Sequence, residues 1–233
     1  MINPLQSNLS RKEARREKHR QVQDEVYEQY EDLHQQQESY VLGMWTFLVT
    51  EVLFFGVLFV AYMIYRWQYQ PYFFAIHEAL NIPLGGLNTV VLLSSSFSMA
   101  LAVHYAQIRA KNKQLAALGF TLMCAFGFLI IKSFEYAEKF QHHHFPGPLF
   151  HLGKEGVPEH VGELFYSLYF AMTGLHGLHV IIGIICISTL MWLVYTDHPI
   201  LTDYIPTELI GLYWHFVDLV WIFLFPLFYL MPR

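Results

Sequence analysis

The chain has 233 residues, of which 55% are hydrophobic, 17% aromatic and only 14% charged, and its mean hydropathy is +0.32. This composition is typical of an integral membrane protein and argues against a water-soluble domain or a nucleic-acid partner. The net charge of −5 carries little information, because the charged residues gather outside the apolar stretches. Cys124 and Cys186 both lie inside apolar stretches, so we expect neither a disulfide nor a zinc site.

The N-terminal region is polar and lacks the apolar core of a secretory signal peptide. Its apolar residues recur at helical spacing, at Val22, Val26, Tyr30 and Leu33. This spacing predicts an amphipathic helix over about residues 11–38, which either docks on a neighbouring subunit or stays solvated and stabilised by its own salt bridges. We therefore divide the chain into a charged cytoplasmic helical region, 1–39, and a membrane domain, 40–233.

Five stretches are apolar over enough residues to cross a bilayer, which needs about 20 residues of helix. They are roughly Tyr40–Tyr65, Leu84–Tyr105, Leu115–Lys132, Leu164–Tyr195 and Leu209–Met231. The predicted fold is an all-α membrane protein, a bundle of five transmembrane helices with an N-terminal amphipathic helix. The fourth stretch is longer than a span needs, so we expect it to tilt or to protrude.

Basic residues are distributed unevenly between the two sides of the predicted bundle. One side carries Arg11, Lys12, Arg15, Arg16, Lys18, Arg20, Arg109, Lys111 and Lys113. The other side carries Arg66, Lys132, Lys139, Lys154 and Arg233. The positive-inside rule therefore predicts that the N-terminus lies in the cytoplasm and the C-terminus outside.

The first stretch contains a carboxylate, Glu51, about 11 residues from its start and roughly 16 Å deep, near the middle of the bilayer. A charged side chain at that depth costs about 2.5–3.5 kcal/mol on insertion scales and therefore normally faces protein and has a partner. Glu51 either ties helices together or serves as a proton or lipid site, and its position is compatible with both.

Small and polar residues mark the second stretch, which contains Gly85, Gly86 and Asn88 and continues into the serines 94–96. Small residues let helix backbones approach, and Asn and Ser form hydrogen bonds between helices, so the predicted role of this set is packing. The third stretch ends in Phe134, Glu135 and Tyr136, which we interpret as anchors at the membrane interface.

Two histidines, His176 and His179, lie in the fourth stretch beside Gly174 and Gly177. Because they are three residues apart on one helix, they cannot be the two axial ligands of one haem. His215 in the last stretch differs from His179 in depth by roughly 10 Å, which argues against that pair as well. We expect the two histidines to form interhelical hydrogen bonds beside close contacts that the glycines allow.

The last stretch places His215, Asp218 and two tryptophans within an otherwise apolar segment. At helical spacing Trp214, Asp218 and Trp221 share one face, and His215 lies one turn from Asp218. We interpret this face as a polar seam that meets other helices and fixes their packing.

The loop before the fourth stretch is rich in histidine, at positions 142–144, 151 and 160. Histidine clusters can bind zinc or copper, but no Cys and no regular ligand spacing accompany this one. A flexible external loop is the favoured interpretation.

Five strings, taken in order, give the chain a family resemblance. They are Glu51–Phe55, Leu87–Thr89 with Leu92–Leu93, Phe134–Tyr136, Gly174–Val180 and Tyr213–Asp218. With these strings the chain resembles subunit III of the haem-copper terminal oxidases, the cytochrome c and quinol oxidases, from about Tyr40 to Met231. Many members of that family have seven helices. The chain lacks the first two and is similar to the five-helix bacterial type, in which an extended subunit I can supply the missing pair.

The resemblance implies an accessory subunit of a proton-pumping oxygen reductase in aerobic respiration. Haem and copper would be held by the partner subunits I and II, so we expect no cofactor, no metal and no catalytic residue in this chain, which would be a non-catalytic part of an enzyme complex. Its expected partners are subunits I and II and bound phospholipid. Contact with cytochrome c or quinol, or membership of a respiratory supercomplex, would arise through the other subunits.

Residue roles follow from the same resemblance. Glu51 matches the family's membrane glutamate, which implies a position facing the family's lipid cleft. Subunit III of that family supports proton uptake and the lifetime of the enzyme during turnover, so Glu51 is expected to be a lipid-binding or proton-related residue. Five further residues are expected to be intramembrane packing residues, namely Asn88, His176, His179, His215 and Asp218. Cytochrome c oxidase is the favoured activity of the complex, and quinol oxidase is the alternative.

Two other classes remain as weaker alternatives. An independent b-type cytochrome would use His104, His176, His179 or His215 as haem ligands. A small transporter would show a helix broken at the midplane or an inverted repeat, and the sequence shows neither.

Overall fold

The computed structural model describes residues 30–77, 82–147, 150–153, 156–198 and 203–230. Within these ranges the secondary structure is helical: α2 (Leu33–Gln68), α3 (Gln70–His77), α4 (Ile82–Gln107), α5 (Lys111–Gln141), α6 (Glu159–Tyr195) and α7 (Ile205–Tyr229). All except α3 are long and apolar enough to cross a membrane. The predicted five-helix membrane bundle is thus confirmed, whereas most of the predicted N-terminal amphipathic helix lies outside the described residues.

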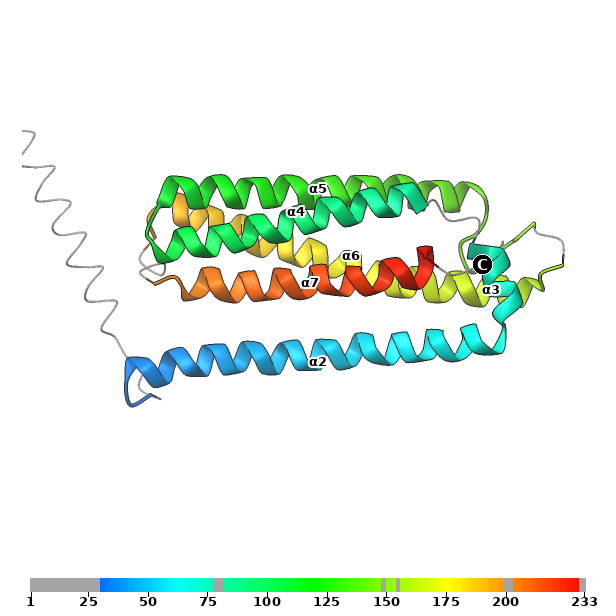
Figure 1. Ribbon diagram of the computed structural model, residues 1–233, viewed down its shortest axis with the longest axis horizontal. Helices are drawn as coiled ribbons and strands as arrows, with labels where there is room; N and C mark the ends of the chain where they lie inside the picture. Colours follow the sequence, from blue (N-terminus) through cyan, green and yellow to red (C-terminus); the bar gives the residue numbers. More distant parts are fainter. Residues whose placement is uncertain (1–29, 78–81, 148–149, 154–155, 199–202, 231–233) are drawn as a thin grey trace, which may run out of the picture.

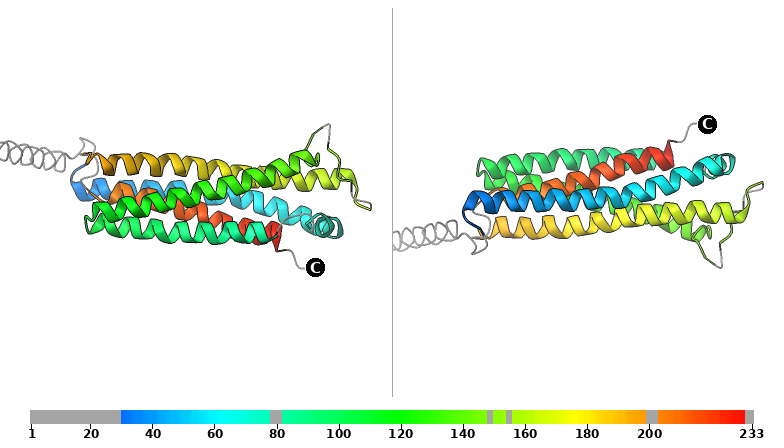
Figure 2. Two further views of the ribbon diagram at one scale, coloured as in Figure 1. Left: turned by 90° about the horizontal axis from the view of Figure 1, so that it is seen from above. Right: turned by 90° about the horizontal axis from the view of Figure 1, so that it is seen from below.

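The five long helices lie side by side and alternate in direction (Figures 1 and 2). α7 occupies the centre, where it contacts α2, α4 and α6, and α4 packs along α5. Half of the most apolar segment of α7 is buried inside the bundle, against 17% for α2. α7 is therefore the core helix, and α2 is attached at the edge.

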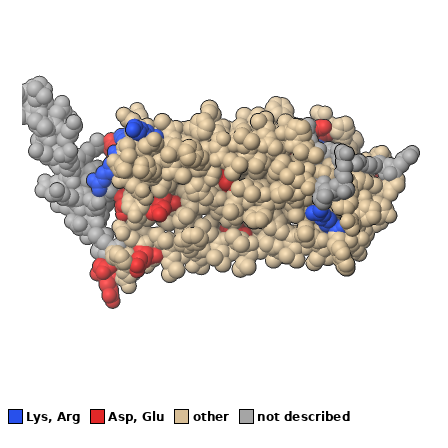
Figure 3. Space-filling view, in the orientation of Figure 1, with Lys and Arg blue, Asp and Glu red and all other residues tan. Residues whose placement is uncertain are grey.

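Charged side chains are nearly confined to the two ends of the face seen in Figure 1, with small acidic areas near the middle (Figure 3). Large apolar side chains cover the surface between the ends, among them Val57, Phe97 and Phe134, which are 69%, 67% and 73% exposed. In water such a surface would aggregate, but in a bilayer it matches lipid tails or the apolar surface of another membrane protein.

Two helices are longer than their predicted spans. α5 continues past Lys132 to Gln141, so Glu135 and Tyr136 lie in its body. α6 has 37 residues, which gives it a length of roughly 55 Å, compared with about 30 Å for the hydrocarbon core. Its Glu159 end extends beyond the end of α7 (Figure 2).

The short helix α3 covers one end of the bundle (Figure 1). Its buried residues are Phe73, Ile76 and His77, and His77 Nδ1 lies 2.9 Å from the Phe228 carbonyl oxygen of α7. Eight residues span barely two turns, so the hydrophobic spacing of this segment was too brief to reveal the helix.

The tightest helix contact lies between α6 and α7, where Gly183 faces Trp214. A Cβ atom on Gly183 would lie 2.6 Å from Trp214 Cζ3, so only glycine fits without movement. The same indole donates a hydrogen bond from Nε1 to Ser95 Oγ of α4 at 2.9 Å. Trp214 is therefore held from two sides and joins three helices.

We predict that Gly183→Ala lowers the free energy of unfolding by about 1–3 kcal/mol, because the added methyl group displaces a fixed indole. Gly177→Ala on the same helix is the matched control, since nothing lies within 4 Å of its Cβ position. The control should be neutral or slightly stabilising, because alanine favours helix by up to about 1 kcal/mol. Unfolding in mixed micelles with increasing SDS, followed by circular dichroism, measures both. Equal losses in the two variants would contradict the packing argument.

Candidate functional site

Glu51 of α2 and His179 of α6 meet within the membrane span. Glu51 Oε2 lies 3.1 Å from His179 Nε2. The other ring nitrogen, Nδ1, lies 2.7 Å from the carbonyl oxygen of Leu175, one turn earlier in α6. A carbonyl oxygen only accepts hydrogen bonds, so this contact assigns the Nδ1 position a proton.

A hydrogen bond between His179 Nε2 and Glu51 Oε2 requires one further proton between these two atoms. With Nδ1 protonated, Nε2 can accept a hydrogen bond from a neutral Glu51 carboxyl group. In the other arrangement Nε2 carries the proton and the imidazolium pairs with an ionised Glu51. Moving the proton between these states requires no rearrangement of either side chain, so the geometry suits an acid–base pair.

The Glu51–His179 pair lies at the edge of the bundle. The side chains of Glu51 and His179 are 20% and 13% exposed. The rings of Phe55 and Phe216 stand edge-on to the imidazole, with centroids 5.3 and 6.5 Å away. Aromatic groups thus shield the inner side of the pair, and its outer side remains accessible.

A second polar group joins α4 to α7. Ser96 Oγ lies 2.7 Å from His215 Nδ1. Neither oxygen of Asp218, one turn further along α7, has a hydrogen bond within the described part of the chain. Asp218 is only 3% exposed, and Trp214 and Trp221, which share its face of α7, are fully buried. The predicted inward face of the last helix is thus present in the structure.

Asn88 and His176 differ from their predicted behaviour. Both are buried, at 0% and 1% exposure, yet neither Asn88 amide atom and neither His176 ring nitrogen has a hydrogen bond among the described residues. His176 instead packs against the rings of Phe128 and Trp221, at centroid distances of 5.6 and 5.4 Å. Of the two histidines expected to bond between helices, only His179 does so. The reason is orientation: His176 faces the aromatic core, and His179 faces α2.

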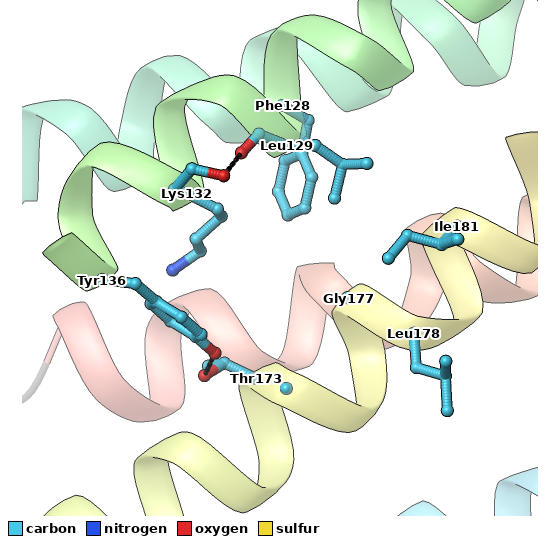
Figure 4. Close-up of a pocket in the computed structure, with 10 residues that line it drawn as sticks. Phe128, Leu129, Lys132, Tyr136, Thr173, Gly177, Leu178 and Ile181 are labelled. Carbon is cyan, nitrogen blue, oxygen red and sulfur yellow. Dashed lines mark hydrogen bonds between the residues drawn. The ribbon is translucent and has the colours of Figure 1, made fainter. Parts of the chain in front are cut away.

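The glycines beside these histidines were also misjudged. A Cβ on Gly177 would meet nothing within 4 Å, and one on Gly174 would meet only the Tyr136 hydroxyl at 3.9 Å. Both line an open groove of about 330 Å³ between α5 and α6 (Figure 4). The hydrogen bond between Tyr136 and Thr173, 2.6 Å long, links the two helices at one end of this groove. The close helix contact is made by Gly183 instead.

The sequence missed a buried ionic network at the far end of α5. Lys132 Nζ lies 2.9 Å from Glu135 Oε2 and 2.8 Å from the Tyr229 hydroxyl, and it stands 4.7 Å from the Trp221 ring centroid. Glu135 Oε1 accepts hydrogen bonds from the hydroxyls of Tyr169 (2.6 Å) and Tyr229. The network joins α5, α6 and α7.

Glu135 is therefore not the interface anchor that its position suggested. It is 2% exposed and Lys132 is 8% exposed, so both are buried and neutralise each other. The only local signal was the spacing of the two residues, three apart on one helix face. The tyrosine partners come from segments more than 30 residues away, and a single sequence does not show that they converge.

The histidine-rich loop contains no metal-binding group among the described residues, where no three His, Cys, Asp or Glu side chains come together. His151 Nδ1 lies 2.8 Å from Glu159 Oε1, and the His144 ring stacks on Tyr166 at a centroid distance of 4.9 Å. His151 also donates its backbone N–H to the His143 carbonyl. These contacts give the described part of the loop a defined conformation against α6.

A family model described as Cytochrome c oxidase subunit III matches residues 15–145 and 159–232. The chain belongs to the cytochrome c oxidase subunit III family. The matched segments contain Glu51, His179, Ser96, His215 and Asp218, which form the first two polar groups.

Named relatives agree with this assignment. The chain is 35% identical to cytochrome c oxidase subunit 3 of Synechocystis sp., over 82% of this chain and 75% of the relative. It is 32% identical to cytochrome c oxidase subunit 3 of Thermostichus vulcanus, over 86% and 91%. It is also 30% identical to the probable quinol oxidase subunit 3 of Staphylococcus haemolyticus, over 82% and 88%. This member of the subunit III family is thus an accessory oxidase subunit, with cytochrome c oxidase favoured as the activity of the complex.

We predict that Glu135→Ala lowers the free energy of unfolding by about 3–5 kcal/mol, because it leaves the Lys132 charge buried without its partner. The double variant Lys132→Met, Glu135→Leu removes both charges and should lose less than the single variant. Glu138→Ala, at an exposed position of the same helix, is the control and should change stability by no more than about 0.5 kcal/mol. SDS-driven unfolding measures all three. A double variant less stable than Glu135→Ala would refute the charge-pair explanation.

We predict that docking of the histidine-rich loop weakens in acid. Burial lowers the pKa of His144, and the nearby positive charge of Lys139 lowers it further. A histidine in the undocked loop titrates near 6.5, so below that pH the undocked state binds more protons and docking loses stability as the pH falls. Amide hydrogen exchange in residues 142–153, corrected for intrinsic rates, should be faster at pH 5 than at pH 7.5. His144→Phe keeps the stacking but cannot titrate, so its corrected rates should change less with pH than those of the wild type.

Proposed function

We propose that this chain is subunit III of a cytochrome c oxidase, packed against oxidase subunits I and II, and that its Glu51–His179 pair supports proton uptake by the complex. The observation that carries the proposal is the geometry of that pair. Its two members share one proton, lie in the membrane span and keep an accessible outer side. An accessory subunit can assist proton uptake by holding a proton beside the uptake route, without any redox centre of its own.

Bound phospholipid is the second part of the proposal. The edge helix α2 exposes large apolar side chains along its length, including Leu42, Leu53 and Val60 at 69%, 64% and 60%. The groove between α5 and α6 adds a further apolar recess. The family resemblance associates phospholipid with the surface around Glu51, and the loosely packed edge helix offers an apolar surface there.

The proposed location is a bacterial cytoplasmic membrane with the N-terminus in the cytoplasm. Lys132 and Lys139 were counted as basic residues of the external side, yet both are buried within α5. Removing them from the count leaves Arg66 as the one basic residue at that end of the described chain, against Arg109, Lys111 and Lys113 at the other. The corrected count therefore supports the proposed orientation more strongly.

Haem and copper are proposed to belong to the partner subunits. Both nitrogens of His179 are engaged by Leu175 and Glu51, and Nδ1 of His215 is engaged by Ser96. The purified chain should therefore lack a haem absorbance band and should copurify with a haem-containing core in mild detergent. Haem bound at one per isolated chain would favour a b-type cytochrome instead. A quinol-oxidising core in the purified complex would favour the quinol oxidase alternative.

We predict that Glu51→Gln leaves the complex assembled but slows proton uptake or shortens the lifetime of the enzyme during turnover. The glutamine amide can still donate a hydrogen bond to His179, so packing survives, but it cannot exchange a proton. Oxygen consumption and its decay over many turnovers should be compared with the wild-type complex. The control, Glu138→Gln, changes an exposed carboxylate at the end of α5 and should behave as wild type. Unchanged turnover in Glu51→Gln would assign Glu51 a purely structural role.

A further inference from the structure

On one side of the bundle α7 lies between α2 and α4. α7 contacts both helices, and Figure 1 looks onto this side. Along α7, His215, Leu219 and Ile222 follow each other at helical spacing; the latter two are 48% and 43% exposed. Together with Gly56 of α2 and Leu93 of α4, these residues define what we call the α7 face.

His215 is the unusual member of the α7 face. It lies ten residues from the start of α7 at Ile205, roughly 15 Å along the helix and well inside the span. Its Nδ1 is bonded to Ser96, but its Nε2 has no hydrogen bond within the described part of the chain. The residue is partly exposed, and Nε2 is not among the buried side-chain atoms without a partner, so it can be reached from outside the subunit. A polar nitrogen facing hydrocarbon without a partner is strongly unfavourable.

The group behind His215 defines what its partner must offer. The Ser96 hydroxyl can either donate a hydrogen bond to His215 Nδ1 or accept one from it. If the hydroxyl donates to Nδ1, then Nε2 carries a proton and donates outward. If Nδ1 carries the proton and donates to the hydroxyl, then Nε2 accepts. In both cases the occupant needs a polar group at this depth, which an acyl chain lacks.

The α7 face also has room for the backbone of another helix. Phe55 packs on Phe216 at a centroid distance of 6.2 Å, which places the next residue, Gly56, near the level of His215. A Cβ on Gly56 would meet nothing within 4 Å. Small residues at such positions let a second transmembrane helix approach closely.

The α5–α6 side differs at the level of His215, which the contacts of its neighbour Trp214 with Ser95 and Gly183, and of Ser95 with Thr121, locate on the other helices. The large exposed residues there are apolar, as with Phe120, Met123 and Ile182 at 43%, 62% and 41%. Such a surface needs nothing but lipid tails.

The Glu51–His179 pair is also partly exposed, but its two members bond each other. The α7 face differs from both surfaces because His215 Nε2 has no hydrogen bond within the described part of the chain.

We propose that a transmembrane helix of a neighbouring oxidase subunit covers the α7 face and offers a polar side chain to His215 Nε2. The inference rests on the proposed function, because it takes the neighbour to be a subunit of the same oxidase. It adds to that function the surface by which the chain is attached and the chemistry that the neighbouring helix must present.

Substitution of His215 in the assembled oxidase tests the contact. His215→Phe removes both ring nitrogens, and retention of the chain in detergent should weaken by roughly three- to tenfold, the range of an intramembrane hydrogen bond. His215→Gln keeps a donor and an acceptor and should retain the chain nearly as wild type does. Ser96→Ala removes only the internal bond and should also retain it. Equal losses in His215→Phe and Ser96→Ala would show that His215 serves the chain's own packing, and no loss in His215→Phe would overturn the proposal.

Site-specific photo-crosslinking identifies what covers the α7 face. Benzoylphenylalanine at Leu219, one turn from His215, should crosslink in the purified holoenzyme to a haem-containing subunit. The same probe at Met123 on α5, which is 62% exposed, is the matched control and should yield phospholipid adducts. Lipid adducts alone at Leu219, or equal protein adducts at both positions, would overturn the proposal. Failure of the wild-type chain to copurify with any haem-containing core would instead overturn the proposed function.

Discussion

The hydrocarbon core of a membrane contains no water, so a polar side chain within a span is stable only if the protein supplies its partner. This constraint explains the most specific contacts of the bundle. The charge of Lys132 is balanced by Glu135 three residues further along the same helix, and the remaining oxygen of that carboxylate accepts tyrosine hydroxyls from two other helices. Removing such a group from water is costly, and a full set of partners offsets that cost. The ionic network therefore specifies which helices meet at this end of the bundle.

The same constraint explains why α7 is the central helix. Its indole nitrogens donate to hydroxyls of α4, from Trp214 to Ser95 and from Trp221 to Thr89. The Tyr213 hydroxyl donates to the His179 carbonyl of α6. In lipid there is little hydrophobic force to drive one helix onto another, so directional bonds and close packing determine the arrangement. α7 carries both, whereas α2 contributes few such bonds and remains at the edge.

The sequence predicted the features of this arrangement that depend on a single segment, and it missed those that depend on how two helices pack together. Length and hydropathy located all five spans, because crossing a bilayer needs a run of apolar residues within one segment. The inward face of the last helix was also predictable, since Trp214 and Asp218 share a face by spacing alone. The pairing of Glu51 with His179 was not predictable, because it depends on the rotation of α2 against α6. The partners of Lys132 were hidden for the same reason.

Unpaired polar atoms have different meanings in the interior and at the surface. Asn88 and His176 are buried at 0% and 1% exposure, so no neighbouring subunit can reach them. A neighbouring subunit therefore cannot supply the hydrogen bonds that these two side chains lack in the described chain. His215 is different, because its free nitrogen faces outward at a depth where lipid offers no hydrogen bond. A subunit that balances its polar groups internally could exist alone in lipid. A subunit that leaves one at its surface depends on a neighbour, as an accessory subunit of an oxidase does.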